Sequence, residues 1–226
     1  MSADTLTWRS SLRSDVGKVR KLNEDSGIAQ PEERLWCVAD GMGGHSAGDL
    51  ASQMIVNSLA KVKASENLSE HVDFVEHSIL GVNNRLHELS TAQNQTSGST
   101  VIVLLGGARH AVFMWAGDSR LYRLRNGALE QLTTDHPSGN MVTRAVGAAE
   151  NLFLDIDIVA VESGDRFLLC SDGLDKHLSD PEIEAVLRDG EPEHVVDELV
   201  ETTLARGAVD NVTVCVVDAQ AGDQPG

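Results

Sequence analysis

Positive charge is scarce in this sequence, and no long apolar run occurs in it. The chain has 226 residues, of which 18 are Lys or Arg and 35 are Asp or Glu, so its formal net charge at pH 7 is −17. Nucleic acids and anionic membrane surfaces are bound through cationic patches, which argues against both as partners. No segment has the roughly 20 consecutive apolar residues that a membrane-spanning helix needs.

Cysteine is also rare. The three cysteines, Cys37, Cys170 and Cys215, are far apart and odd in number, and each lies in an apolar run. They therefore indicate buried thiols in a reducing compartment and argue against a disulfide framework. Residues 1–15 lack the apolar block and the small-residue cleavage site of a secretory signal. We expect a cytoplasmic protein.

The hydrophobic periodicity predicts an α+β fold. Apolar residues alternate or form short runs, as in strands, over 6–12, 35–39, 101–105, 111–116, 121–124, 129–132, 154–161, 166–171 and 212–217. They recur every three or four residues, as in helices, over 50–62, 72–89, 183–187 and 195–204. Because elements of one type follow one another, largely antiparallel sheets between helical layers are predicted. We expect one catalytic domain over 1–218 and a flexible tail over 219–226.

Acidic residues lie at the ends of these predicted strands. Asp40, Asp118 and Asp172 each follow an apolar strand, Asp210 opens the last strand, and Glu24 precedes a short one. A single Asp-Gly or Asp-Ser would be interpreted as a turn. Several carboxylates at one end of a fold repel each other unless a cation compensates them, and Mg²⁺ and Mn²⁺ prefer such oxygen ligands. The spacing therefore predicts an all-oxygen metal site.

Other polar residues narrow the chemistry of this site. The eight histidines never show His-x-x-x-His spacing, and no Cys-x-x-Cys occurs, which argues against zinc. Arg20 lies four residues before Glu24, where its guanidinium could bind a phosphate through two hydrogen bonds. The alternative interpretation of Arg20 is an exposed side chain in a basic stretch.

Eight ordered motifs resemble those of one family. They are RKLNED at 20–25, VADGMGGHSAG at 38–48, SGST at 97–100, GDSR at 117–120, LTTDH at 132–136, TRAVG at 143–147, CSDG at 170–173 and DNV at 210–212. With these motifs the chain resembles the metal-dependent protein serine/threonine phosphatases of type 2C (the PPM family) in their short bacterial form. The motifs span nearly the whole chain, and eight of them in order are specific.

The resemblance implies a four-layer α-β-β-α sandwich, in which two central antiparallel β-sheets are flanked by helices. It also implies two Mn²⁺ or Mg²⁺ ions at one end of the sandwich, with a possible weaker third. Carried over to this sequence, Asp40 bridges the two ions and the Gly41 carbonyl helps to hold one of them. Asp172 and Asp210 bind the other ion.

The resemblance assigns supporting roles to five further positions. Glu24 acts mainly through a coordinated water, and Asp118 matches, with Asp172, the weaker third metal position. Arg20 would hold the substrate phosphate. Asp25, grouped with Arg20 among the catalytic residues, supports the outer shell of the site together with Asn211.

Such a metal pair lowers the pKa of a shared water and neutralises the phosphoryl oxygens as charge develops. The resemblance therefore implies direct, in-line attack of a bridging hydroxide on phosphoserine or phosphothreonine, without a phosphoenzyme. The expected partners are phosphorylated proteins and a bacterial serine/threonine kinase that the enzyme opposes. We expect no binding of nucleic acid or membrane, and a monomer.

Two departures from the family pattern affect the expected chemistry. Met42 stands where many members carry His, so an acid for the leaving group is absent there, and a bound water or His45 is the alternative. The stretch between two of the motifs, from Pro137 up to Thr143, is short where many bacterial relatives have a longer flap, so substrate selection would rely on other surface. Short soluble members also accompany type VI secretion clusters with a transmembrane kinase, which makes that setting a hypothesis.

Other hydrolase classes fit less well. Cysteine-based phosphatases need Arg six residues after the nucleophile, where this chain has Gly43, Lys176 and Ala221. Ile156 and Ile158 alternate with aspartates as in a half-buried strand, which argues against a haloacid-dehalogenase motif. Neither Gly-Lys-Ser/Thr nor Gly-x-Ser-x-Gly occurs. The non-enzymatic alternative is a binding module with the same fold, but such a chain should have lost metal ligands, and this one retains them.

Overall fold

The computed structural model describes residues 6–43, 47–94, 97–137 and 144–222. Its strands are β1 (Leu6–Asp15), β2 (Asp25–Gln30), β3 (Leu35–Gly43), β4 (Ser97–Ser99), β5 (Val101–Gly106), β6 (His110–Ala116), β7 (Arg120–Arg125), β8 (Ala128–Gln131), β9 (Asp155–Ala160), β10 (Arg166–Cys170) and β11 (Val212–Ala221). Its helices are α1 (Ala47–Leu59), α2 (Leu68–Gln93), α3 (Asp172–Asp175), α4 (Asp180–Leu187) and α5 (Pro192–Ala205), with a 3-10 turn at Pro31–Glu33.

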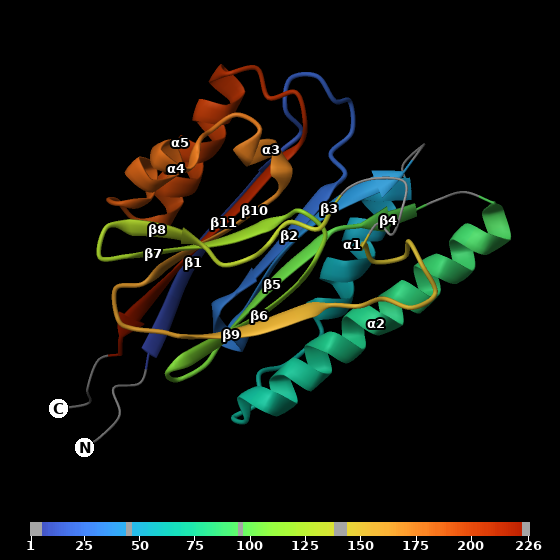
Figure 1. Cartoon of the computed structure of the whole chain (residues 1–226), viewed down its shortest axis with the longest axis horizontal. Coiled ribbons are helices and arrows are strands. Elements are labelled where there is room, and N and C mark those ends of the chain that lie inside the picture. Colours follow the sequence, from blue (N-terminus) through green and yellow to red (C-terminus); the bar gives the residue numbers. More distant parts are fainter. Residues whose placement is uncertain (1–5, 44–46, 95–96, 138–143, 223–226) are drawn as a thin grey trace.

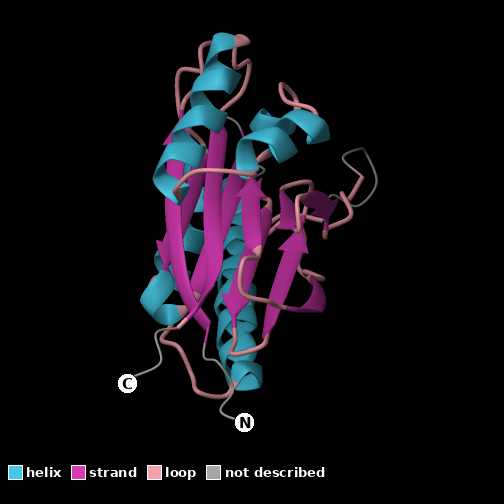
Figure 2. Ribbon diagram, turned by 90° about the vertical axis from the view of Figure 1, so that its left-hand side faces the viewer, coloured by secondary structure: helices cyan, strands magenta, loops and turns pink. Residues whose placement is uncertain are grey.

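These strands form two antiparallel sheets. The first sheet has the strand order β1-β11-β10-β7-β8, and the second has the order β2-β3-β5-β6-β9, with β4 also paired to β3. In Figure 1, α1 and α2 cover the second sheet, whereas α3, α4 and α5 cover the first. Figure 2 shows the strands of both sheets between these helical layers. The predicted α+β sandwich of two antiparallel sheets flanked by helices is therefore confirmed.

Three apolar clusters hold the layers together. The first lies between the second sheet and α1 and α2, where Ile55 and Ile79 pack with residues of β3, β5 and β6. The second, with Trp36 and Phe167, fills the space between the sheets, and the third joins α3, α4 and α5 to the first sheet. Alternate residues of the central strands face different clusters, as strand geometry requires. Leu50, expected on the buried face of its helix, is instead 49% exposed, and Ala51 takes the buried position.

The first and last described strands pair along their whole length. β1 and β11 run antiparallel in register from Leu6 opposite Ala221 to Asp15 opposite Val212, and β11 also pairs with β10. The tail predicted over 219–226 is therefore wrong at its start, because Ala219 is fully buried and its backbone N–H donates to the Asp165 carbonyl. The remainder of that tail, 223–226, lies outside the described residues.

All three cysteines are free and buried, as expected. They occupy β3, β10 and β11, where their side chains contribute to the apolar clusters. Among the described helices, none is long and apolar enough to cross a membrane.

Candidate metal centre

Strand ends and turns bring nearly all the predicted site residues to one cavity of about 260 Å³. The acids come from different segments: Asp40 from β3, Asp118 from the turn after β6, Asp172 from the start of α3 and Asp210 from the residue pair before β11. Arg20, Glu24, Gly41 and Asn211 also line the cavity. Asp25 lies beside it, 6% exposed, as the first residue of β2.

Strand β3 is longer than its sequence indicates, because it changes partner near Asp40. Residues 35–38 pair with β5, whereas residues 41–43 pair with β4. At the junction Thr100 holds Asp40 from both sides: the Asp40 N–H donates to Thr100 Oγ1 (3.1 Å), and the Thr100 N–H donates to the Asp40 carbonyl (2.8 Å). The strand therefore continues through Asp40, which was expected to end it, and the carboxylate lies in a fixed stretch of backbone.

Asp25 and Asp40 face each other across β2 and β3. Ser171 Oγ donates to Asp25 Oδ2 (2.7 Å), but Asp25 Oδ1 is buried without a hydrogen-bond partner. Burial raises the pKa of Asp25 to about 6, and the neighbouring Asp172 and Asp210 carboxylates add to the effect. Burial followed by the charge of Asp25 also raises the pKa of Asp40 well above its usual range. Two like charges directly opposite in a sheet are destabilising, so this pair is compensated only when a proton or cation is added.

Asp118 extends the same acidic cluster. The turn that carries it begins at Gly117, whose φ of +115° favours glycine. Burial raises the pKa of Asp118, and the nearby Asp172 carboxylate is the next cause. The acids of the cavity therefore act on one another, although they are far apart in the sequence.

Two cations reach the other side of the cavity. Lys176 Nζ lies 2.6 Å from Asp172 Oδ2 and 3.0 Å from Asp210 Oδ2. Arg20 binds Asp210 through Nε (2.9 Å) and Nη2 (3.1 Å). Burial alone would raise the pKa of Asp210, but the Lys176 hydrogen bond and charge outweigh it and lower that pKa overall. Burial alone would likewise lower the pKa of Lys176, yet its bonds to the two acids raise it overall.

The chemistry of the cavity fits divalent metal ions. Its potential ligands are oxygens, and Oδ1 of both Asp25 and Asp172 is buried without a partner, which leaves lone pairs for a cation. Within the described ranges, however, no three His, Cys, Asp or Glu side chains already converge as a metal would require. Because Lys176 and Arg20 draw Asp172 and Asp210 toward themselves, a metal would require these side chains to turn.

Asn211 fixes the backbone of the segment that carries Glu24. Its Oδ1 accepts the Glu24 N–H (2.9 Å), and its Nδ2 donates to the carbonyls of Val16 (2.9 Å) and Leu22 (3.0 Å). The amide thus holds both sides of the loop between β1 and β2. Asn211 thus contacts Glu24 through the Glu24 backbone N–H and supports that residue.

A family model described as protein phosphatase 2C matches residues 18–208. The chain belongs to the protein phosphatase 2C family. The matched range contains most of the strands and helices and most of the residues that line the acidic cavity. Asp210 and Asn211 lie just beyond it.

Relatives of this protein phosphatase 2C chain include bacterial serine/threonine phosphatases. It is 33% identical over 240 residues to the serine/threonine protein phosphatase PstP of Mycobacterium tuberculosis, with 96% of this chain covered. The match covers 46% of PstP, so the chain spans about half the length of that relative.

Solved structures agree in fold. PppA, described as a key regulatory component of T6SS in Pseudomonas aeruginosa, is 44% identical, with a TM-score of 0.91 and coverage of 94% of this chain and 98% of PppA. The catalytic domain of PstP in complex with 2 manganese ions is 32% identical, with a TM-score of 0.85 and coverage of 96% of this chain and all of that one.

One protein phosphatase 2C motif, LTTDH at 132–136, supports the Asp118 turn. His136 Nδ1 accepts the Gly117 N–H (3.0 Å), and the ring stacks on Trp115 with centroids 5.9 Å apart. Asp135 binds Arg120 through two nitrogens, Nε (3.0 Å) and Nη2 (2.7 Å). These contacts fix the turn without contributing a side chain to the cavity lining.

Sequence reasoning missed two charged residues of the protein phosphatase 2C cavity region. Lys176 and Asp175 follow the CSDG motif on and just after α3. Asp175 pairs with Arg120 (3.1 Å), and burial raises its pKa to about 6. Helical spacing would have indicated Lys176, since it stands four residues after Asp172.

The two departures from the family pattern lie at the cavity and near it. Met42 lines the cavity and is 36% exposed, so no acid stands at that position. His45 and most of the short flap, 138–143, lie outside the described residues.

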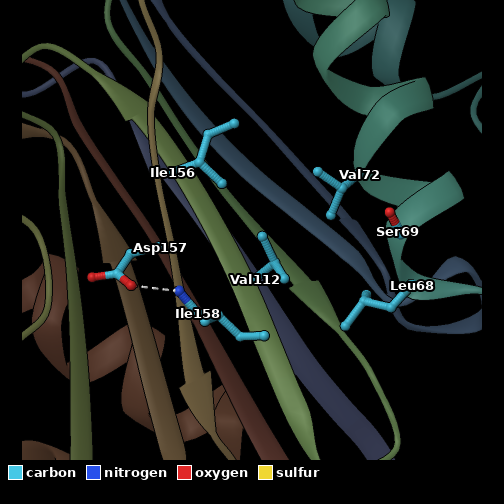
Figure 3. A pocket seen from close by; sticks show the side chains of 7 residues that line it. All are labelled: Leu68, Ser69, Val72, Val112, Ile156, Asp157 and Ile158. Atoms are coloured by element: carbon cyan, nitrogen blue, oxygen red, sulfur yellow. Dashed lines mark hydrogen bonds between the residues drawn. The ribbon is translucent and has the colours of Figure 1, made fainter.

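A second hollow differs from the acidic cavity in its chemistry. It has a volume of about 480 Å³ and lies between α2 and the edge strand β9, with Leu68, Val72, Val112, Ile156 and Ile158 around it. Figure 3 shows these apolar side chains around the open groove, while Asp157 turns back to accept the Ile158 N–H. Its lining is mostly apolar, whereas the acidic cavity gathers charged side chains.

Proposed function

We propose that this protein phosphatase 2C chain hydrolyses phosphoserine and phosphothreonine in proteins by direct, in-line attack of water. The observation that carries the proposal is the gathering of Asp40, Asp118, Asp172 and Asp210 in one cavity. Lysine and arginine side chains compensate the last two of these acids, and no such contact is found for the first two among the described residues. Two divalent cations held there by these acids, the Gly41 carbonyl and a water on Glu24 would activate the attacking water and neutralise phosphoryl oxygens.

The chain's own residues would orient the reactants. Arg20, half exposed at the rim, releases Asp210 and binds the substrate phosphate through two guanidinium nitrogens. Asp25 Oδ1 has no partner of its own and would accept a hydrogen bond from a water bound in the site, because Ser171 occupies only Oδ2. Asn211 keeps Glu24 in place through the backbone. Binding acts in the ground state, whereas compensation of phosphoryl charge acts most in the transition state.

Close backbone packing supports the proposed roles of the glycines. A Cβ on Gly41 would lie 2.1 Å from the Gly48 carbonyl oxygen, and a Cβ on Gly173 would lie 1.8 Å from that of Asn211. No side chain fits at either position, so the Asp40 segment packs through backbone against α1 and Glu24, and the Asp172 segment packs through backbone against the Asp210 segment. Such packing keeps the proposed ligands at short range.

We propose a bacterial serine/threonine kinase as the activity that this enzyme opposes. The likeness to PppA supports a role beside a type VI secretion system, since that protein is described as a regulatory component of one. The buried free thiols support a reducing, cytoplasmic location. We assign the catalytic domain to residues 6–221.

Phosphate release from a phosphothreonine peptide tests the proposed reaction. The purified chain is assayed after metal removal, with Mn²⁺ restored, and as Asp40→Asn, with Asp157→Asn on exposed β9 as the matched control. We expect release only with Mn²⁺, a loss of at least about a thousandfold in Asp40→Asn, and wild-type rates in Asp157→Asn. Mn²⁺-loaded wild-type protein that releases no phosphate from any phosphopeptide would leave the binding-module alternative.

A further inference from the structure

The Lys176 ammonium bridges the acids at the ends of two neighbouring strands. It contacts Asp172 Oδ2 at 2.6 Å and Asp210 Oδ2 at 3.0 Å, and these acids follow β10 and precede β11. The two carboxylate side chains are only 23% and 20% exposed. A cation in this position therefore compensates both of these largely buried acids at once.

Local structure directs Lys176 to this position. It follows the short α3, and its backbone N–H donates to the Asp172 carbonyl (3.1 Å), so the residue stands one helical turn after the acid. Leu174 is fully buried, and Gly173 packs against the Asn211 carbonyl. The turn is thus anchored just before the lysine, which leaves the side chain directed back over the ends of the strands.

A metal ion and this ammonium cannot share the two carboxylates. Mg²⁺ lies about 2.0–2.1 Å from its oxygen ligands, so a cation bound between Asp172 and Asp210 would come within repulsive contact of Nζ. The ammonium must leave before the ion is fully coordinated. Arg20 differs in this respect, because it contacts only Asp210 and its side chain is half exposed.

We propose that Lys176 is an internal competitor for the cation at Asp172 and Asp210, and that it sets the metal affinity of the site. The proposal rests on the metal-dependent function proposed above. In the metal-free protein Lys176 compensates the acids, and metal binding displaces it toward solvent, to which 40% of its side chain is already exposed. The lysine thereby weakens metal binding and stabilises the metal-free fold.

Calorimetric titration of Mn²⁺ into metal-stripped protein tests this role directly. Lys176→Met removes the ammonium while keeping a long side chain, and Lys61→Met removes the same charge from an exposed position after α1. We expect the Mn²⁺ dissociation constant to fall about tenfold in Lys176→Met, since two charge-assisted bonds no longer compete. It should stay within about twofold of wild type in Lys61→Met.

Thermal unfolding supplies a second readout that does not depend on activity. Metal-free Lys176→Met should melt below metal-free wild type, whereas the Mn²⁺-saturated proteins should differ much less, because the ammonium is displaced in both comparisons. Lys176→Gln replaces Lys176→Met if the latter does not fold. Equal or weaker Mn²⁺ affinity in the folded Lys176 variant overturns the proposal.

The outcomes separate this proposal from the proposed function. Wild type that binds Mn²⁺ and releases phosphate, with unchanged affinity in Lys176→Met, overturns only the role of Lys176. Tighter binding in Lys176→Met without phosphate release by any Mn²⁺-loaded form overturns the proposed reaction and supports the competitor. Absence of Mn²⁺ binding to wild type and to Lys176→Met overturns both.

Discussion

The two ends of the strand pair β10 and β11 compensate their acids in opposite ways. At one end Arg166 and Asp218, opposite each other in register, form two hydrogen bonds of 2.6 and 2.7 Å, and both side chains are 12% exposed. Arg125 holds the buried Asp165 beside them in the same two-bond manner. At the other end Asp172 and Asp210 face the partly exposed ammonium of a lysine and a half-exposed arginine, next to the unpaired Asp25 Oδ1.

This contrast separates acids that hold the fold from acids that remain available. Burying a carboxylate is costly without a partner, and a bidentate arginine supplies that partner permanently. An ammonium on a flexible chain can leave, and an orphan oxygen can accept a ligand. Aspartates at the two ends of one strand pair therefore differ: those at one end hold the fold, and those at the other end remain available to a ligand.

The largest effect is expected from a substitution at the cavity end of the β10–β11 pair. Asp172→Asn should lower Mn²⁺-dependent phosphate release by at least about a thousandfold, because a neutral amide no longer compensates or holds the cation. The fold should persist, since the change removes one charge from a crowded acidic group. Steady-state rates on a phosphothreonine peptide, together with the thermal midpoint, check both parts. Retained turnover in a folded variant would contradict the assignment.

The next largest effect is expected from a substitution at the opposite end of the pair, where Arg166 and Asp218 meet. Asp218→Asn leaves the largely buried Arg166 guanidinium without its counter-charge and should lower the free energy of unfolding by about 3 kcal/mol. Denaturant unfolding with Mn²⁺ present measures the loss. Phosphate release well below the melting temperature should stay near wild type, because Asp218 lies at the far end of β11 from the cavity. A loss of activity without a loss of stability would contradict the structural role of Asp218.

The raised pKa of Asp25 predicts how pH acts on the metal-free protein. A folded-state pKa of about 6, above the unfolded value, stabilises the fold at low pH, and this contribution is lost as pH rises through about 6. Denaturant unfolding in EDTA should therefore show the free energy of unfolding of Asp25→Asn rising relative to that of wild type by about 1.4 kcal/mol between pH 5 and pH 7.5. Parallel pH curves for the two proteins would show that Asp25 titrates normally.

The smallest effect comes from an exposed ion pair that resembles neither end. Arg13 on β1 contacts Asp197 (2.9 Å) and Glu201 (2.6 Å) of α5, whose side chains are 62% and 64% exposed. Arg13→Ala should lower the free energy of unfolding by less than about 1 kcal/mol, since water screens such pairs. Denaturant unfolding measures this variant beside Asp218→Asn. A loss of stability as large as that of Asp218→Asn would contradict the distinction between exposed and buried ion pairs.

Local patterns predicted the fold because they reflect burial directly. The apolar runs before Asp118 and Asp172 placed these acids at strand ends, and both do line the cavity. Patterns failed where tertiary contact decides: Leu50 matches the helical spacing yet lies in solvent, and β11 continues past Val217 because β1 pairs with it. Periodicity records which residues are apolar, not which neighbour covers them.

Contacts between distant residues were harder to foresee. The Asn211–Glu24 hydrogen bond joins residues 187 positions apart, and the Lys176–Asp210 contact joins residues 34 apart. The DNV motif indicated that Asn211 is involved, but only the fold shows that it acts on the backbone of the β1–β2 loop. Lys176 belongs to none of the motifs, so charge compensation became visible only when the acids were placed together.

The position of β11 inside the first sheet constrains how the protein can be made. β11 separates β1 from β10, so β1 has no strand partner in that sheet until residues 212–221 have left the ribosome. The nascent chain must therefore carry β1 without this partner until β11 is made, and the edge of β10 stays unfinished over the same last stretch between the two strands. We expect the second sheet, whose strands all lie within residues 25–160, to form during translation, and the acidic cavity to close only after release of the last strand.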